Sequence, residues 1–342
     1  MTRQEALDLF GSPDLIGIGM AADALRRKLH PEGVVTYIID RNINYTNFCT
    51  EYCTFCAFYR PLGHAEGYVL PKEAIFRKIQ ETIDLGGTGV LMQGGLHPDL
   101  KIDWYEDLLR SIKQRFHIHL HCFSSPEILN IAEVSGLTLR DTIIRLRDAG
   151  LDSIPGGGAE ILDDAVRRRV SRLKCSTQEW ADVHLIAHRL GMRTTATMMF
   201  GCGETLEERV NHLEVVRRIQ EETGGFTAFI PWTYQRAHTA LAHSVKDEAT
   251  AVEYLKTLAI SRLYLEDIEN VQCSWVTQGL KTCQIGLRFG GNDVGSIMIE
   301  ENVVSAAGTH HRASEEELRR IIRDAGFVPK QRDTLYRTLF LN

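Results

Sequence analysis

At 342 residues the chain is long enough to bury a sizeable core, either as two ordinary domains or as one large barrel with extensions. Hydrophobic residues make up 44% and charged residues 25%, with 9 prolines and 28 glycines, which excludes a disordered or fibrous chain. The net charge of -6 excludes a global basic field for nucleic acid or anionic lipid. Because no apolar run reaches the ~18–20 residues of a membrane span and the first residues lack a signal-peptide core, we expect a cytoplasmic protein without a membrane partner.

Short apolar stretches alternate along the chain with longer amphipathic segments. Residues 4–30 have a helical pattern, and we expect a helical extension over 1–33. The predicted strands are 34–43, 89–93, 118–123, 152–155, 194–200, 226–231, 271–276 and 294–299. The predicted helices between and after them are 71–85, 104–115, 139–149, 177–190, 205–222, 248–268 and 314–325. Eight alternations predict a TIM-type (β/α)₈ barrel over 34–342 with a C-terminal extension, and an open doubly wound sheet is the alternative.

Several predicted strands end in polar or glycine-rich segments. The first runs into residues 44–47 and a group of cysteines, the second into 93–95, the third into Ser124, and the fourth into 156–160. In a parallel barrel these ends share one face, where active sites lie. We therefore expect the cysteine loop and the glycine loops to meet in space.

Three of the eight cysteines, Cys49, Cys53 and Cys56, fall within eight residues, which indicates a metal site in a reducing compartment. Three thiolates in one loop can hold an iron–sulfur cluster and leave one iron without a protein ligand. Two alternatives remain open: a zinc site completed by His64, and a ferredoxin-type carrier whose fourth ligand is Cys122. The scattered cysteines are expected to be small buried hydrophobes: Cys122, Cys175, Cys202, Cys273 and Cys283.

The spacing Cys-x₃-Cys-x-aromatic-Cys directly after a first strand resembles the radical S-adenosylmethionine (radical SAM) superfamily. Further segments resemble its menaquinone and deazaflavin branch: 40–47, 56–60, 92–98, 155–160 and 291–293. The run 45–60 and the segment 153–160 resemble the cyclic dehypoxanthine futalosine synthases most closely. Aminofutalosine synthases and deazaflavin-forming enzymes share most of these motifs and remain alternatives within the branch.

This resemblance implies one 4Fe-4S cluster on Cys49, Cys53 and Cys56, with S-adenosylmethionine completing the fourth iron. It also implies that the cofactor is contacted by Phe55, Gln93, Gly94, Gly95, Ser124 and Glu160. Where many superfamily members carry Gly-Gly-Glu, this chain has Gln93-Gly94-Gly95 followed by Leu96, so an acidic side chain is absent there. The glycines still allow a ligand to approach the backbone closely.

The resemblance further implies an oxidoreductase that forms a carbon–carbon bond within dehypoxanthine futalosine, a step of menaquinone biosynthesis. Its partners would be this small molecule and an electron donor such as flavodoxin or ferredoxin, with no nucleic acid. One group must take a proton from the substrate, and the catalytic candidates are Glu160, His97 and Asp293. The substrate-binding candidates are Arg60, whose guanidinium could bind a carboxylate or form a loop ion pair, and Tyr234, Gln235 and Glu300 near late strand ends.

Overall fold

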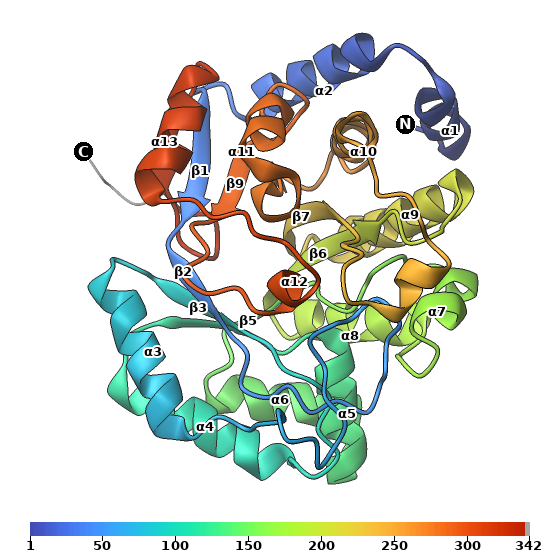
Figure 1. The fold of residues 1–342 in the computed structure, drawn as a ribbon. Coiled ribbons are helices and arrows are strands. Elements are labelled where there is room, and N and C mark those ends of the chain that lie inside the picture. Colours follow the sequence, from blue (N-terminus) through green and yellow to red (C-terminus); the bar gives the residue numbers. More distant parts are fainter. Residues whose placement is uncertain (339–342) are drawn as a thin grey trace.

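A parallel sheet of seven strands, curled into a half-barrel, forms the centre of the molecule in this computed structural model, which describes residues 1–338 (Figure 1). Its strands follow one another in chain order: β2 (Asp40–Ile43), β3 (Gly89–Met92), β4 (His119–Cys122), β5 (Ser153–Ile154), β6 (Arg193–Phe200), β7 (Phe226–Thr233) and β8 (Asn270–Val271). Consecutive strands are added in one direction, whereas a doubly wound sheet reverses its strand order. The TIM-like α/β fold predicted from the sequence is thus confirmed.

The remaining strands bring the two edges of this sheet toward each other. β1 (Val34–Ile38) runs directly into β2, and it pairs with β9 (Asp293–Ser296) and β10 (Val328–Gln331) in a three-stranded parallel sheet. A single bridge between Gln272 and Asp293 joins the end of β8 to β9. The β1–β2 strand is therefore shared by both sheets, with its first half beside β9 and its second half beside β3.

Helices cover the outer face of the strands, and apolar side chains fill the space between them in two core clusters. The helices are α3 (Lys72–Asp84), α4 (Ile102–Arg115), α5 (Ser125–Ser135), α6 (Leu139–Ala149), α7 (Asp164–Val170), α8 (Thr177–Arg189), α9 (Leu206–Thr223), α10 (Ala251–Tyr264), α11 (Trp275–Gly286), α12 (Val303–Ala306) and α13 (Glu315–Asp324). At the N-terminal end, α1 (Arg3–Gly11) packs on α9 and α10, and α2 (Leu15–Leu29) packs on α10. Within residues 1–338, no helix combines the length and the apolar character needed to cross a bilayer.

Several elements differ from the predicted pattern. The strand predicted over 271–276 ends at Val271, because Trp275 already begins α11. The helix α5 was not predicted, although Ser124 and Glu127 form a capping box at its start and Pro126 stands in its first turn. The strand β10 was not predicted either, because Val328–Gln331 is short and contains a proline.

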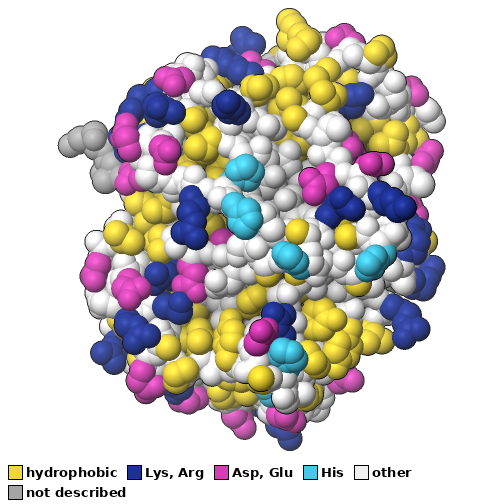
Figure 2. All heavy atoms as spheres, viewed as in Figure 1, with side chains coloured by type: hydrophobic (Ala, Val, Ile, Leu, Met, Phe, Trp, Pro, Cys, Tyr) yellow, Lys and Arg dark blue, Asp and Glu magenta, His cyan; other side chains and the backbone are white. Residues whose placement is uncertain are grey.

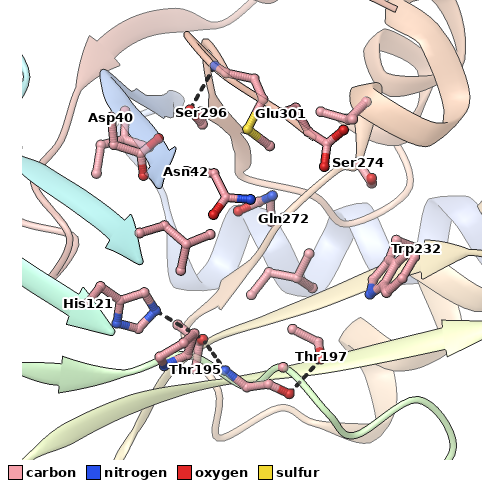
Figure 3. Close-up of a pocket in the computed structure, with 18 of the residues that line it drawn as sticks. Asp40, Asn42, His121, Thr195, Thr197, Trp232, Gln272, Ser274, Ser296 and Glu301 are labelled. Carbon is pink, nitrogen blue, oxygen red and sulfur yellow. Dashed lines mark hydrogen bonds between the residues drawn. The ribbon is translucent and has the colours of Figure 1, made fainter. Parts of the chain in front are cut away.

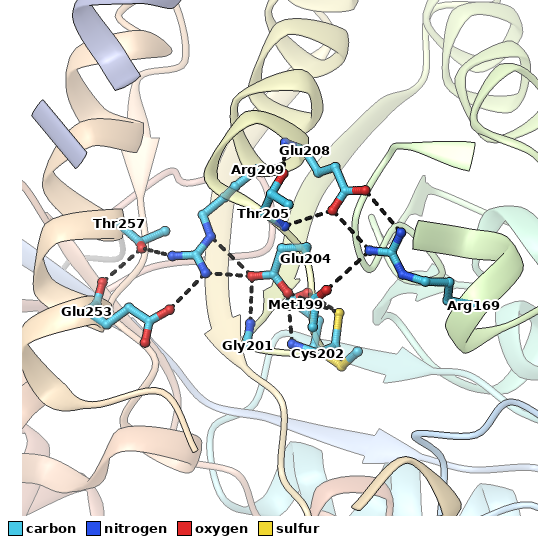
Figure 4. Close-up of polar contacts among 11 residues, drawn as sticks. Arg169, Met199, Gly201, Cys202, Glu204, Thr205, Glu208, Arg209, Glu253 and Thr257 are labelled. Carbon is cyan, nitrogen blue, oxygen red and sulfur yellow. Dashed lines mark hydrogen bonds and ion pairs between the residues drawn. The ribbon is translucent and has the colours of Figure 1, made fainter. Parts of the chain in front are cut away.

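The loop after β6 shows how a strand end is fixed to the helical layer (Figure 4). Both carboxylate oxygens of Glu204 accept backbone hydrogen bonds, from Gly201 N and Cys202 N, each at 2.8 Å. Arg209 of α9 donates to Glu204 Oε1 at 2.5 Å and to Glu253 Oε1 of α10 at 2.8 Å. One buried arginine thus ties this loop to two helices.

Candidate active site

The loops after the first four strands of the barrel meet at one end of it, as the sequence predicts. A side-chain carbon on Gly95 would lie 2.2 Å from the carbonyl oxygen of Phe48 and 2.8 Å from Cys49 Cβ. A side-chain carbon on Gly157 would lie 2.5 Å from Gln93 Nε2. Glycine is thus required at Gly95, where the backbone of the neighbouring loop occupies the space of a side chain, whereas at Gly157 the side chain of Gln93 would have to shift.

Backbone contacts hold the cysteine loop against its neighbours. Cys49 N donates to Arg60 O at 3.1 Å, which closes the loop on itself. Thr54 donates from its amide and its hydroxyl to Val170 O, at 2.9 and 2.8 Å, and Thr54 O accepts from Leu241 N at 2.8 Å. The position of the three cysteines therefore depends on segments more than a hundred residues away.

The thiols of the three cysteines are partly shielded from solvent. Cys53 is buried, Cys49 and Cys56 are half-buried, and all three are unpaired. Burial raises the pKa of Cys49 and Cys53, and the ammonium group of Lys174 acts against this rise. Thiolates here need a positive partner, which a cationic metal cluster supplies.

The donor set fits a cluster better than a single ion. Within residues 1–338, no group of three His, Cys, Asp or Glu side chains lies close enough together to hold one metal ion. In a 4Fe-4S cluster each thiolate binds a separate iron, so the ligands need not converge on one point. His64, the fourth ligand of the zinc alternative, is exposed and accepts a hydrogen bond from Glu66 N. Cys122, the fourth ligand of the ferredoxin alternative, lies in the apolar core outside the sheet.

Glu127 organises the end of β3 and the start of α5, and it was not identified from the sequence. This buried carboxylate accepts from Gly94 N at 2.8 Å, from Tyr45 OH at 2.8 Å and from Ser124 Oγ at 2.6 Å. Burial raises the pKa of Glu127, and these hydrogen bonds act in the opposite direction. Ser124, a predicted cofactor contact, thus also caps α5.

Glu160 lies between the cysteine loop and the interior of the barrel. Its Oε1 accepts from Lys174 Nζ at 2.9 Å, and its Oε2, 3.6 Å from an Arg167 nitrogen, has no hydrogen-bond partner although it is buried. The Lys174 ammonium lies 5.4 Å from the ring centre of Phe55, so it reaches back to the cysteine loop. Since buried polar atoms are rarely left unpaired, the free oxygen fits a ligand hydroxyl, as in the ribose of S-adenosylmethionine.

A cavity of about 300 Å³ occupies the barrel interior next to Glu160 (Figure 3). Its walls come from alternate strand residues, which point inward: Ile38, Asp40, Asn42, Leu91, Gln93, His121, Thr195, Thr197, Ile230 and Trp232. The interior of a TIM barrel is normally filled by branched side chains, and small residues at Gly156 and Thr195 leave room here. Met298 and Glu301, together with Val304 of α12, line one end of the cavity, and Figure 1 shows α12 in front of the barrel strands. The volume suits a small-molecule ligand.

Asp40 and His121 line the cavity but were not predicted from the sequence as site residues. Burial raises the pKa of Asp40 to about 6, since Ser296 and Arg332 only partly compensate. Burial lowers the pKa of His121 to about 3. The sequence signal was the alternation of polar residues along apolar strands, which places Asp40 with Asn42, and His119 with His121, on the same face of their strand.

Two of the proposed catalytic residues are placed outside the cavity lining. His97 is buried beyond β3, where its Nδ1 accepts from Asp99 N at 3.1 Å, and burial lowers its pKa. Asp293 is fully buried and paired with Arg332 at 2.5 and 3.0 Å, and it accepts from Thr36 Oγ1 at 2.5 Å. Arg332, rather than Asp293, contributes to the cavity wall.

The four proposed substrate contacts have protein partners and also lie outside the cavity lining. Arg60 donates to Glu66 Oε2 at 2.7 Å and to backbone carbonyls of its own loop. Glu300 is bound by Lys78 at 2.6 Å. Tyr234 is buried with its hydroxyl on Thr239, and Gln235 Oε1 accepts from Thr309 Oγ1 at 3.0 Å.

Comparison with known proteins agrees with this geometry. Residues 43–216 match the model of the radical SAM superfamily, and residues 223–341 match the family model described as the CofH/MqnC C-terminal region. The chain therefore belongs to the radical SAM superfamily, within the family that the CofH/MqnC C-terminal region defines.

The relatives that cover nearly the whole chain carry two different names. The cyclic dehypoxanthine futalosine synthase of Halalkalibacterium halodurans is 51% identical over 98% of this chain and 90% of its own. The 5-amino-6-(D-ribitylamino)uracil–L-tyrosine 4-hydroxyphenyl transferase of Methanothermobacter thermautotrophicus is 43% identical over 99% of this chain and 94% of its own. The FeFe-hydrogenase maturase of Carboxydothermus hydrogenoformans shares the fold, with a TM-score of 0.78 and 16% identity over 98% of this chain and 77% of its own.

Proposed function

We propose that the chain is a radical SAM cyclase that converts dehypoxanthine futalosine to cyclic dehypoxanthine futalosine in menaquinone biosynthesis. The observation that carries this proposal is the similarity, over nearly the full length of both chains, to a cyclic dehypoxanthine futalosine synthase. The barrel cavity supports it, because its size and the polar side chains on its mainly apolar walls suit one small sugar-bearing molecule held beside the cysteine loop.

Cys49, Cys53 and Cys56 would hold one 4Fe-4S cluster, and Gln93, Gly94, Gly95 and Glu160 would surround S-adenosylmethionine. When bound, these cofactors supply a 5′-deoxyadenosyl radical that removes a hydrogen atom from C4′ of the sugar. The free oxygen of Glu160 accepts a ribose hydroxyl, and Lys174 keeps its carboxylate oriented.

The barrel wall has two tasks in this reaction. It holds the sugar against the aromatic ring so that the new carbon–carbon bond forms within one molecule. It also keeps water and unrelated C–H bonds away from a primary radical. Apolar residues such as Ile38, Leu91, Ile230 and Trp232 serve this second task around the polar contacts.

The proposal includes an electron donor of the flavodoxin or ferredoxin type, because the cluster must be reduced before each radical is formed. It places the enzyme in the cytoplasm, where thiols stay reduced, in keeping with eight unpaired cysteines in the structure.

The test is anaerobic incubation of the reconstituted enzyme with dithionite, S-adenosylmethionine and dehypoxanthine futalosine. We expect free 5′-deoxyadenosine together with a product that lacks two hydrogens, and neither compound from Cys53→Ala. A parallel assay offers L-tyrosine and 5-amino-6-(D-ribitylamino)uracil. Hydroxyphenyl transfer in this second assay, with dehypoxanthine futalosine left unchanged in the first, would contradict the proposal. In a third assay that offers a benzoate enol ether, a product that retains the adenosyl group would instead indicate an aminofutalosine synthase.

A further inference from the structure

Two histidines on β4 share one serine hydroxyl on β5. Ser153 Oγ lies 2.7 Å from His119 Nε2 and 2.7 Å from His121 Nδ1. Ser153 pairs directly with His121 across the two strands, and His119 stands two residues earlier on the same face of β4. Ser153 is 1% exposed, so both contacts are made inside the protein.

The hydroxyl has a single hydrogen, which limits how the three groups can bond. If Ser153 donates to His119 Nε2, then His121 must donate from Nδ1 to the oxygen of Ser153. In this arrangement the Nε2 atom of His121 carries a free lone pair. Its nearest protein partner is Thr195 Oγ1 at 3.5 Å, and Figure 3 shows His121 on the cavity wall. In this arrangement the cavity end of the hydrogen-bonded series His121–Ser153–His119 is a proton acceptor.

His119, at the other end of this hydrogen-bonded series, lies toward the outside of the barrel. His119 is the first residue of β4, at the end of the barrel opposite the cysteine loop, and it is partly exposed. The charged groups around it are Asp152, Lys113, Asp333 and Arg337, while His119 and Arg332 face His121. Burial lowers the pKa of both histidines, so each is a neutral imidazole near pH 7 and passes an added proton on rather than keeping it.

We propose that His121, Ser153 and His119 form a proton relay from the cavity to the opposite end of the barrel. This inference rests on the proposed function, because the cyclised ring must lose one proton and one electron to become aromatic again. The ring C–H bond breaks, its proton passes to His121 Nε2, and its bonding electrons remain in the ring. The single surplus electron of the ring goes to a one-electron acceptor of the iron–sulfur class. His121 passes a proton through Ser153 to His119, which releases one to solvent.

The other carboxylates near the cavity are less suited to this task. Glu160 is paired with Lys174 and Asp293 with Arg332, so their charge is already compensated. Asp40 and Glu301 face the cavity without such a pair within the described chain, but both oxygens of Glu301 accept backbone N–H groups of residues 303–305, which leaves Asp40 as the competing acceptor. The variant Asp40→Asn therefore belongs in the same experiment.

The chain provides a matched control for the relay. His184 Nδ1 and His188 Nε2 both contact Thr194 Oγ1, at 2.9 and 2.7 Å, so a second hydroxyl joins two histidines. These residues lie between α8 and the outside of the sheet, and none of them lines the cavity. If a hydroxyl bridge between two histidines only stabilised the structure, the Thr194 group and the Ser153 group would respond to substitution in the same way.

The first measurement is the ratio of 5′-deoxyadenosine to cyclised product. We expect Ser153→Ala, His121→Gln and His119→Ala to form 5′-deoxyadenosine while product formation falls about a hundred-fold. Added imidazole should restore product in His119→Ala, which leaves a partly exposed gap, but not in Ser153→Ala. The control His188→Ala should keep the wild-type ratio with or without imidazole.

A ratio that stays at the wild-type value in Ser153→Ala and His119→Ala would overturn the relay. So would a ratio that rises only in Asp40→Asn. If the wild-type enzyme leaves dehypoxanthine futalosine unchanged, the proposed function fails, and a second measurement decides on the relay separately.

This second measurement uses ¹⁵N-histidine spectra of the resting enzyme without substrate. We expect His121 protonated at Nδ1 and His119 unprotonated at Nε2, and we expect Ser153→Ala to change both tautomers. Histidine signals of the His184 and His188 pair should not move in that variant. Tautomers of His119 and His121 that do not respond to Ser153→Ala would contradict the relay, whatever the substrate proves to be.

Discussion

At the scale of single residues, Glu160 has an unusual combination of burial and incomplete bonding. Its side chain is 6% exposed, one oxygen is bound by Lys174, and the other is left without a hydrogen bond. A buried carboxylate oxygen without a partner destabilises the protein unless a ligand supplies the missing hydrogen bond. The position beside both Cys53 and the cavity makes the cofactor the natural source of that hydrogen bond.

We predict that Glu160→Ala weakens S-adenosylmethionine binding by roughly ten- to a hundred-fold, because a charge-assisted hydrogen bond is worth about 1.5–3 kcal/mol. Glu160→Gln keeps one acceptor oxygen and should lose less. The affinity is measured by anaerobic titration of the cluster-bound protein. Glu66→Ala, which removes an exposed carboxylate from the cysteine loop, is the control and should bind normally. Unchanged affinity in a folded Glu160→Ala protein would remove this residue from the cofactor site.

Asp40 gives a prediction about stability and pH. Its pKa is raised to about 6 by burial, whereas an unfolded aspartate has a pKa of about 3.9. The folded protein therefore binds the proton of Asp40 more tightly than the unfolded chain does. Ionisation of Asp40 lowers the free energy of unfolding progressively between about pH 4 and pH 6, and by a constant amount above pH 6. Asp40→Asn should stabilise the protein at pH 7.5 by up to about 3 kcal/mol and have little effect at pH 4.

Denaturant unfolding at these two pH values measures the effect of Asp40→Asn. Asp8→Asn, on the exposed side of α1, is the control for a surface carboxylate. An equal change in the free energy of unfolding at both pH values would show that ionisation of Asp40 is not the cause.

At the scale of elements, the sequence predicts the barrel strands well because their inner and outer faces are both buried. Apolar runs of that kind stand out between amphipathic helices, as at Gly89–Met92 and Arg193–Phe200. The strand β10 escapes prediction because its place beside β1 depends on a contact with residues nearly three hundred positions away. No local pattern records such a pairing.

The predicted and the missed site residues differ in the same way, in how far the local sequence determines their position. The cysteines and the glycine loops follow strand ends directly, so their common face can be predicted. Glu300 and Tyr234 also stand near strand ends, but Lys78 binds the first and Thr239 the second. His121 was missed because the direction of a side chain depends on strand register rather than on residue type.

The cysteine loop and the loop after β3 are in close contact at Gly95. Gly95→Ala would bring a methyl group to 2.2 Å from the carbonyl oxygen of Phe48, so the cysteine loop must move. We expect lower iron content after reconstitution and weaker S-adenosylmethionine binding in a protein that still folds. Iron analysis and anaerobic titration test both. Gly11→Ala, with open space around it, is the control. Normal iron content in Gly95→Ala would show that the loop adapts without cost to the cluster.

At the scale of the whole molecule, the C-terminal segment closes the barrel. The strand β10 lies beside β1, and Arg332 reaches from the residue after β10 to Asp293 on β9. Arg332 also lines the cavity, so its guanidinium connects the cavity wall to β9 through Asp293. Charged side chains of both signs are interspersed over the outer face shown in Figure 2, whereas this ion pair is buried.

Arg332 therefore contributes both to the stability of the barrel, through its ion pair with Asp293, and to the wall of the cavity. Arg332→Met leaves Asp293 as a buried charge without its partner, and we expect it to destabilise the protein by about 3–5 kcal/mol. Adding Asp293→Asn should recover part of that loss, because the second change removes the unpaired charge. Denaturant unfolding of the wild type, both single variants and the double variant measures the coupling. Free energies that simply add would mean that Asp293 and Arg332 stabilise the barrel independently, through Thr36 and the Asp333 carbonyl rather than through each other.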